Sequence, residues 1–132
     1  MLQIYTAPSC TSCKKAKGWL SSHNIPFEER NIISSPLSAE EVMHILCMCD
    51  EGIDGLVSSR NRHVKTLAHK FDDMPLSEAI QEIVNNPQML RRPIIMDEKR
   101  LHVGYNEEEI RTFLPRSVRV LENGGMQLRN AI

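Results

Sequence analysis

Residues 2–13 read LQIYTAPSCTSC: a short extended run, a turn containing proline, and two cysteines separated by two residues. The composition of residues 2–6 is typical of a β-strand, and the apolar residues from Thr11 onward have helical spacing. A strand therefore leads directly into a helix through Cys10. This arrangement places the Cys10 sulfur at a helix N-terminus, where unpaired N–H groups and the helix dipole stabilise a thiolate.

The spacing of the two cysteines allows redox chemistry. With two residues between them, the Cys13 thiol can attack a mixed disulfide formed on Cys10, so the pair can cycle between a dithiol and a disulfide. We expect Cys10 to be the exposed, reactive thiol and Cys13 the resolving one. The alternative is two reduced thiols in a loop, with no redox role.

The first part of the chain has the order β-α-β, followed by helices alone. Asn24-Ile25-Pro26 breaks the first helix, and residues 27–33 form a second extended stretch. Three segments with helical apolar spacing then follow without an intervening strand. They are residues 38–49, residues 64–71 and residues 76–84. The first opens with a capping box at Ser38 and Glu41, and its helix stops near Gly52.

The last part of the chain returns to β-structure. Residues 94–96 and 101–103 flank a turn and predict a hairpin, and Asn106 with Glu109 forms a capping box for a short helix that Pro115 ends. This order predicts an α/β protein with a thioredoxin-like core, built on a mixed four-stranded sheet. We expect a single domain, 1–132, in which residues 1–34 and 88–115 form the core, 35–87 a helical insertion and 116–132 a partly flexible tail.

The composition excludes several classes of protein. With 41% hydrophobic residues the chain is neither disordered nor a membrane protein, and its 16 basic and 17 acidic residues give no net attraction to nucleic acid. It has neither a secretory signal nor an apolar run long enough to span a bilayer, so we expect a cytoplasmic protein. Cytoplasmic thiols stay largely reduced, and any disulfide there is a signal or a catalytic step.

Two further cysteines lie in the second predicted helix. Together with Cys10 and Cys13, Cys47 and Cys49 would make up a four-thiolate zinc site. However, Cys49 falls on the apolar side of the helix, where cysteine usually acts as a small buried hydrophobic residue, and Cys47 does not. We therefore predict no metal site and no cofactor.

A basic segment lies between Gly55 and Phe71, where no acidic residue occurs. Most such segments are solvated surface, but this one also suits DNA or an acidic protein, with Arg62 and Lys65 as candidate contacts. The basic side chains are Arg60, Arg62, His63, Lys65, His69 and Lys70.

Arg92 precedes Pro93 at the entrance to the hairpin. In thioredoxin-like folds a cis proline often precedes this strand and packs beside the active cysteines, which would bring Arg92 near Cys10. A guanidinium there would stabilise a thiolate or hold an oxyanion. The equally weighted alternative is an edge-strand arginine paired with a carboxylate.

Long collinear segments then give a resemblance over nearly the whole chain. The chain resembles the Spx-type transcriptional regulators of the arsenate reductase (ArsC) family in PSCTSC (8–13), IPF (25–27), ERNI (29–32), SPLS (35–38), LRRPII (90–95), DEKRL (97–101) and VGYN (103–106). It departs from that pattern at Cys47, where the family has a basic residue, and in the tail from residue 122 to 132.

The resemblance implies a redox-sensing regulator and not an enzyme. Such a protein binds the C-terminal domain of the RNA polymerase α subunit, touches promoter DNA only within the polymerase complex, and is degraded by the ClpXP protease with an adaptor. Oxidation of the pair matching Cys10 and Cys13 favours activation of thiol-stress genes. Gly52 matches the glycine that contacts this polymerase domain, with Arg60 nearby, and Arg92 matches an arginine linked to the oxidised state.

Arsenate reductase itself is the main alternative. In that enzyme one cysteine attacks arsenate while three arginines hold the oxyanion. Cys10, Arg60 and Arg92 would match the nucleophile and two arginines, but Tyr105 stands where the third arginine is expected, and such reductases usually lack a cysteine matching Cys13. A general thiol-disulfide oxidoreductase would leave the helical insertion and the basic segment without a role.

Overall fold

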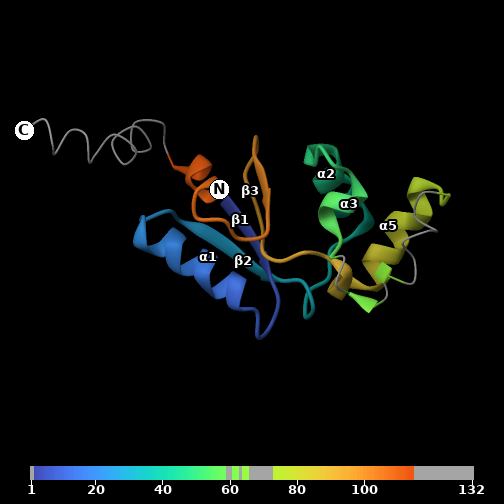
Figure 1. The fold of residues 1–132 in the computed structure, drawn as a ribbon, viewed down its shortest axis with the longest axis horizontal. Coiled ribbons are helices and arrows are strands. Elements are labelled where there is room, and N and C mark those ends of the chain that lie inside the picture. The colour runs from blue at the N-terminus through green and yellow to red at the C-terminus, as the bar shows by residue number, and fades with distance from the viewer. Residues whose placement is uncertain (1, 59–60, 63, 66–72, 115–132) are drawn as a thin grey trace, which may run out of the picture.

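The computed structural model contains one mixed sheet of four strands (Figure 1). Its order is β2 (Phe27–Asn31), β1 (Leu2–Thr6), β3 (Ile94–Met96) and β4 (Leu101–Val103). β1 pairs with β2 in parallel and with β3 antiparallel, and β3 and β4 form the predicted hairpin. The structure describes residues 2–58, 61–62, 64–65 and 73–114.

One face of the sheet is covered by helix α1 (Thr11–Ser22) and by the 3₁₀ helix η2 (Glu109–Phe113). The alternation of side chains along each strand places Ile4 and Ile95 on this face, opposite each other across β1 and β3. The buried cluster here consists of Leu2, Ile4, Ala16, Leu20, Ile95, Ile110 and Phe113.

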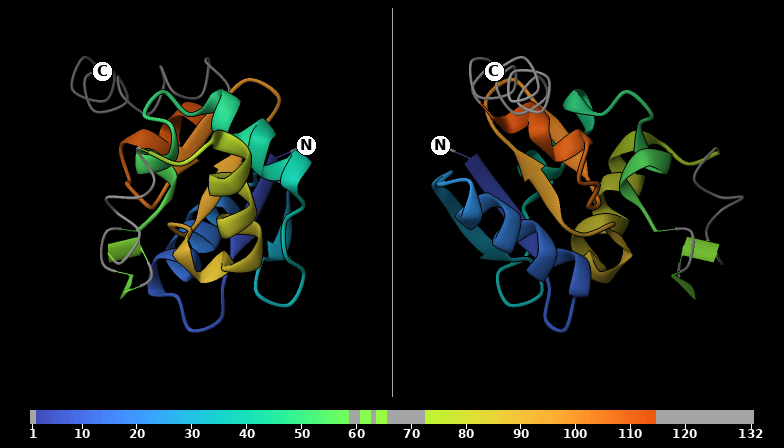
Figure 2. Two further views of the ribbon diagram at one scale, coloured as in Figure 1. Left: turned by 90° about the vertical axis from the view of Figure 1, so that its right-hand side faces the viewer. Right: turned by 60° about the vertical axis from the view of Figure 1, so that its left-hand side comes forward.

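The other face packs against a lobe of helices. α2 (Ala39–Met48), α3 (Ile53–Leu56), α5 (Leu76–Asn85) and the 3₁₀ helix η1 (Pro87–Met89) lie together on this side (Figure 2). Their apolar residues meet the sheet through a buried cluster that includes Tyr5, Val42, Ile45, Leu56, Ile83, Met89, Ile94 and Met96. The sheet therefore separates α1, which carries the Cys-x-x-Cys motif, from the helical lobe.

Two predicted elements differ in detail from the structure. β2 ends at Asn31, and not at residue 33, because the Asn31 side-chain oxygen accepts the backbone N–H groups of Ile33 and Ser34 and turns the chain. The predicted helix after Asn106 is the short 3₁₀ helix η2. Asn106 does accept two backbone N–H groups, but the Glu109 carboxylate faces His102.

The helix predicted at residues 64–71 falls mainly outside the described residues. Of its apolar positions, Val64 is described, and it is buried in the cluster of the helical lobe. None of the helices in the described part of the chain has the length and apolar character that crossing a bilayer requires.

Candidate redox site and partner surface

The two thiols of the Cys-x-x-Cys motif lie at the start of α1. Cys10 is the N-cap residue, with extended backbone angles, and its Sγ accepts the backbone N–H of Cys13 at 3.4 Å. Ser9, just before it, turns the chain with a φ of 57°. Cys10 is half-buried, whereas Cys13 is only 2% exposed. Both are free thiols in this structure.

The environment of Cys13 keeps its thiol protonated. Burial raises the pKa of Cys13 to about 12, and the hydrogen bond with the Cys10 side chain adds to the rise. A hydrogen bond from the Ala7 backbone and the charge of Arg92 act in the opposite direction. The pair therefore contains one accessible thiol at a helix N-terminus and one sealed thiol beneath it. The predicted roles require this arrangement, although the roles themselves remain a prediction.

Arg92 lies beside this pair, after the chain leaves the helical lobe. The Arg92–Pro93 peptide bond is cis, as predicted, and the Pro93 carbonyl accepts the Gly104 N–H at 2.7 Å. Arg92 is half-buried, and within the described residues no carboxylate pairs with it. Its positive charge acts on the Cys13 thiol.

Gly52 lies in the tight turn between α2 and α3. Its φ of 66° and ψ of −144° belong to a region that only glycine adopts without strain, and a Cβ there would meet no atom within 4 Å. The Cys49 Sγ–H donates to the Gly52 carbonyl at 3.4 Å. Gly55, within α3, leaves no room for a side chain, because a Cβ at that position would lie 2.8 Å from the Cys49 sulfur. The Gly52 backbone groups are hydrogen-bonded within the turn, and its Cα faces open space.

A short two-stranded contact connects this lobe to the residues before β3. The Arg91 backbone N–H donates to the Leu56 carbonyl at 2.7 Å, and the Arg91 Nε donates to the Val57 carbonyl at 3.1 Å. Val57 also forms an antiparallel bridge with Leu90. The end of α3 is thus fixed to the residue next to Arg92.

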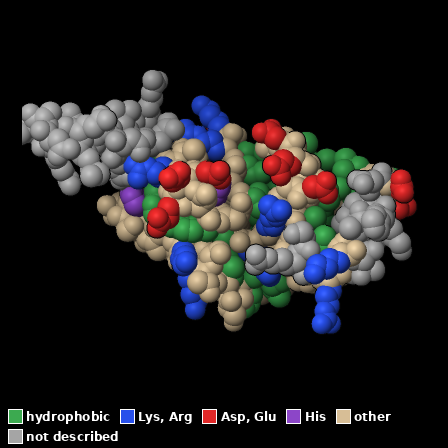
Figure 3. All heavy atoms as spheres, viewed as in Figure 1, with side chains coloured by type: hydrophobic (Ala, Val, Ile, Leu, Met, Phe, Trp, Pro, Cys, Tyr) green, Lys and Arg blue, Asp and Glu red, His purple; other side chains and the backbone are tan. Residues whose placement is uncertain are grey.

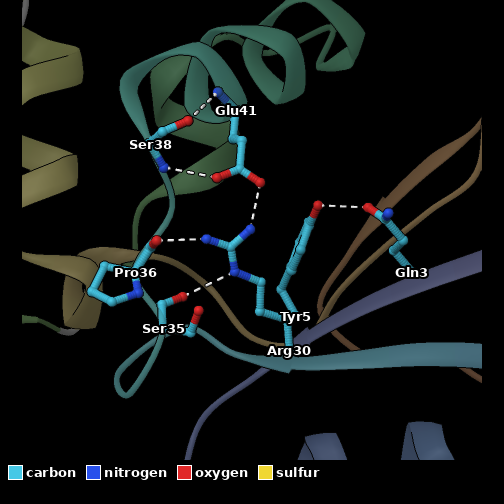
Figure 4. Close-up of polar contacts among 7 residues, drawn as sticks. All are labelled: Gln3, Tyr5, Arg30, Ser35, Pro36, Ser38 and Glu41. Atoms are coloured by element: carbon cyan, nitrogen blue, oxygen red, sulfur yellow. Dashed lines mark hydrogen bonds and ion pairs between the residues drawn. The ribbon is translucent and has the colours of Figure 1, made fainter.

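Arg30, which sequence reasoning did not single out, joins β2 to the start of α2 (Figure 4). Its guanidinium donates to the carbonyls of Ser35 at 3.0 Å and Pro36 at 2.6 Å and pairs with the Glu41 carboxylate. Glu41 also closes the predicted capping box with Ser38, which the structure confirms. Burial alone would raise the pKa of Glu41, but the Ser38 backbone N–H and Arg30 lower it below its usual value.

A second polar contact, also missed from the sequence, joins α1 to the sheet. The Glu29 carboxylate accepts from the Thr6 hydroxyl at 2.8 Å and pairs with the Lys17 ammonium at 3.0 Å. These two hydrogen bonds hold the pKa of Glu29 below its ordinary value. No local pattern identifies Arg30 or Glu29, because their partners come from other elements.

The remaining predicted residues lie at the surface or outside the described residues. Arg62 and Lys65 are both exposed, and Cys47 is exposed on α2, whereas Arg60 falls outside the described residues. Among the described residues, no three His, Cys, Asp or Glu side chains converge on a position that would hold a metal ion.

Tyr105 occupies the position after the hairpin glycine. Its ring packs at the edge of the buried cluster beneath α1, near Trp19, and its hydroxyl donates to Glu107. Burial and the Glu107 carboxylate raise the pKa of Tyr105. The structure thus places a neutral phenol at this position.

The fold and this site define a class: thioredoxin-like α/β proteins with a Cys-x-x-Cys motif at the first helix and a cis proline beside it. Comparison with known families then gives the assignment. The model of the ArsC family matches residues 5–113, and the chain belongs to the ArsC family.

Individual relatives agree with this assignment. The "Global transcriptional regulator Spx 2" of Lactococcus lactis subsp. lactis is 70% identical over 132 residues, with both chains fully covered. The "Global transcriptional regulator Spx" of Bacillus subtilis is 52% identical over 131 residues, which are 99% of this chain and 96% of that one.

Solved structures confirm the predicted fold. A putative ArsC family related protein from Bacteroides fragilis superposes with a TM-score of 0.76 at 25% identity, covering 84% of this chain and 95% of that one. An arsenate reductase from Vibrio cholerae has a TM-score of 0.74 at 16% identity, with 86% and 97% covered. At that identity the second comparison concerns the fold alone.

Proposed function

We propose that this chain is a redox-sensing transcriptional regulator that binds the C-terminal domain of the RNA polymerase α subunit, and that it is not an enzyme. The observation that carries the proposal is the asymmetric thiol pair at the start of α1, in a chain that shares 70% identity over its full length with a named global transcriptional regulator. The proposal treats residues 1–132 as one functional domain and places it in the cytoplasm, with the polymerase.

The switch is a disulfide between Cys10 and Cys13. A peroxide oxidises the Cys10 thiol to a sulfenic acid and releases one water; the Cys13 thiol then displaces the hydroxyl as a second water and forms the S–S bond. In the dithiol form, Cys10 Sγ caps the helix by accepting the Cys13 N–H. Bonding that sulfur to the Cys13 side chain repositions the cap, so the first turn of α1 is where the redox state changes the structure.

A short series of contacts connects the cysteine pair to the Gly52 turn. Arg92 acts electrostatically on Cys13, and its neighbour Arg91 holds the Leu56 carbonyl at the end of α3. Gly52 caps the other end of the same four-residue helix. A shift of Arg92 after disulfide formation is therefore transmitted to the Gly52 turn through one dipeptide and one helical turn.

We assign the contact with the polymerase domain to Gly52 and Arg60, and contacts with DNA within the polymerase complex to Arg62 and Lys65. A Gly52→Arg change tests this placement, but the φ of 66° means that any side chain there strains the backbone. Gly52→Ala is the matched control, because it introduces the same strain without the bulk. Binding lost with arginine and kept with alanine supports the contact, and equal binding by both variants removes Gly52 from it.

Tyr105 and Cys13 separate this function from arsenate reduction. The Tyr105 position supplies a phenol tied to Glu107 in place of an oxyanion-binding guanidinium. Cys13 supplies an internal partner that would close a disulfide on Cys10. We also propose that the ClpXP protease and its adaptor set the abundance of the protein.

The test is a titration of the purified C-terminal domain of the α subunit with the dithiol protein, with arsenate turnover measured on the same sample in the presence of a thiol reductant. We expect saturable one-to-one binding and no turnover above a Cys10→Ala control. Turnover that depends on Cys10, without binding, would make the chain a reductase and would contradict the proposal.

A further inference from the structure

His102, on the edge strand β4, is a buried histidine that the proposed redox chemistry does not use. It lies directly opposite Ile95 in the antiparallel pair of β3 and β4, so its side chain is on the face of the sheet that α1 and η2 cover. The residue is 9% exposed, and its Nδ1 lies 3.4 Å from the Glu109 carboxylate at the start of η2. This contact joins the edge strand to the last helix that the structure describes.

The other ring nitrogen of His102 is buried and unsatisfied. With the proton on Nδ1, facing Glu109, Nε2 is an acceptor, and it has no hydrogen-bond partner among the described residues. Protonation would turn this nitrogen into a donor, again without a partner, and would place a positive charge in a buried position. Burial lowers the pKa of His102 below its ordinary value of 6.5, although the Glu109 carboxylate acts in the opposite direction. The neutral ring is therefore the form that fits the closed structure.

Other charged groups surround β4, but the charge that acts on the His102 ring is that of Glu109. On the lobe side, a cavity of about 420 Å³ lies between β4 and the Gly52 turn, and its charged lining consists of Asp50, Glu51, Arg91 and Glu109. Acidic side chains gather over α2 and α3 on this side of the molecule (Figure 3). On the other side, the titratable groups of α1, the hairpin turn, the segment after β4 and η2 include Lys14, Lys15, Lys17, Arg100, Tyr105, Glu107, Glu108 and Arg111.

η2 is held to the sheet by side chains. Within the described part of the chain, every backbone hydrogen bond of residues 105–114 stays inside that segment. Ile110 and Phe113 are buried in the cluster on the α1 side of the sheet, and Glu109 contacts His102. Opening of η2 therefore breaks a small set of side-chain contacts and leaves the hydrogen bonds of the sheet intact.

We propose that the His102–Glu109 contact is a pH-sensitive latch, which holds η2 on the sheet while the ring is neutral and releases it when the ring is protonated. The protonated ring favours the open state, because there both of its nitrogens donate to water. Release uncovers Ile110 and Phe113, so acid exposes an apolar surface that is closed at neutral pH. The latch requires neither the Cys10–Cys13 pair nor the polymerase domain, so it stands or falls independently of the proposed function.

Hydrogen exchange of the full-length protein, followed by NMR, measures the opening of η2, because the amides of Ile110, Arg111 and Leu114 are hydrogen-bonded. If the ring titrates near pH 6.5 when open and stays neutral when closed, the opening constant rises at most about tenfold between pH 7.5 and 5.5. We expect a rise of about three- to tenfold at these amides, and opening at least about tenfold more frequent than that of β1 at both pH values. No rise, or opening constants equal to those of β1, would overturn the latch.

Three variants separate the His102 ring from a general effect of acid. His102→Gln removes the titrating group and should abolish the rise, whereas His44→Gln, at an exposed position of α2, should leave it unchanged. Glu109→Gln keeps an acceptor for Nδ1 but removes the charge that favours the protonated ring, so the ring should titrate at lower pH. A rise that persists in His102→Gln, or a titration unmoved by Glu109→Gln, would refute the latch.

The NMR titration of the His102 ring in the unaltered protein keeps the latch testable if His102→Gln does not fold. We expect the ring to titrate below pH 6.5, together with the amide shifts of residues 109–114. A ring that titrates at or above pH 6.5, or that titrates without any shift in η2, would contradict the latch.

Discussion

Alkylation of the reduced protein should distinguish sharply between Cys13 and the surface thiol Cys47. The pKa of Cys13 rises from 9.0 to about 12, chiefly through burial, and each pKa unit changes the thiolate fraction tenfold. At pH 8 about one Cys13 in 10⁴ is a thiolate, against about one in ten for a thiol at the unshifted value. The factor from ionisation alone is about 1,000, and the 2% exposure of Cys13 slows the reaction further.

The assay is a time course with iodoacetamide, in which mass spectrometry of tryptic peptides measures each cysteine separately. Cys47, which is exposed, provides the reference rate in the same tube. The Cys10→Ser variant repeats the experiment with an oxygen acceptor in place of the Cys10 sulfur, so alkylation of Cys10 cannot first disturb its neighbour. We expect Cys13 to react at least about 100 times more slowly than Cys47 in both proteins. A ratio below about ten in both would mean that burial does not protect the Cys13 thiol.

Three further predictions concern stability. Arg30→Ala should lower the free energy of unfolding by about 1–3 kcal/mol, because Arg30 donates to two carbonyls and a carboxylate. Lys17→Ala breaks an exposed ion pair and should lower it by at most about 1 kcal/mol. Equal urea midpoints for the two variants would contradict this difference. Burial lowers the pKa of His102 below 6.5, so the unfolded state binds a proton first as the pH falls, and the stability present above pH 6.5 is lost below it. His102→Gln should reduce the loss of stability between pH 7.5 and 5.5. An unchanged loss would rule out His102 as the source of this pH dependence. Gly55→Ala should lower the free energy of unfolding by about 1–3 kcal/mol, because the new Cβ lies 2.8 Å from the Cys49 sulfur. Adding Cys49→Ala should restore part of that stability. If the double variant recovers no stability, the strain does not come from the contact with Cys49.

The sequence predicts those elements whose signals are local. The β1–α1 junction at Cys10, the capping box at Ser38 and the hairpin around residues 97–99 each depend on residues a few positions apart, and the structure contains all three. Asn31 ends its strand two residues early because a side-chain hydrogen bond competes with the sheet. Glu109 turns to His102, a contact across two elements that the capping-box pattern does not contain.

In the candidate site too, features set by local motifs could be predicted, and features set by packing could not. Cys10, Cys13 and the cis peptide before Pro93 follow from motif and fold class, and the structure places Arg92 where its charge reaches Cys13. The burial that raises the pKa of Cys13 comes from packing, which the spacing of two cysteines does not determine. Arg30 also gave no signal, because its partners lie in the following loop and in α2.

The cavity beside Gly52 was equally beyond the reach of the sequence. Asp50 and Glu51 read as two charges in a turn, and His102 as one polar position on an edge strand. Only the packing of the lobe against β4 brings them around one cavity. Because they lie far apart along the chain, no motif connects them.

A disulfide between Cys10 and Cys13 should change the affinity for the polymerase domain, and one calorimetric measurement tests this directly. The C-terminal domain of the polymerase α subunit is titrated with the dithiol protein, with the disulfide protein and with Cys10→Ala treated with the same oxidant. Coupling between two such sites is typically about 1–3 kcal/mol, so we predict affinities that differ at least about fivefold between the two redox forms, with no oxidant effect on Cys10→Ala. Equal affinities for the dithiol and the disulfide would contradict the switch.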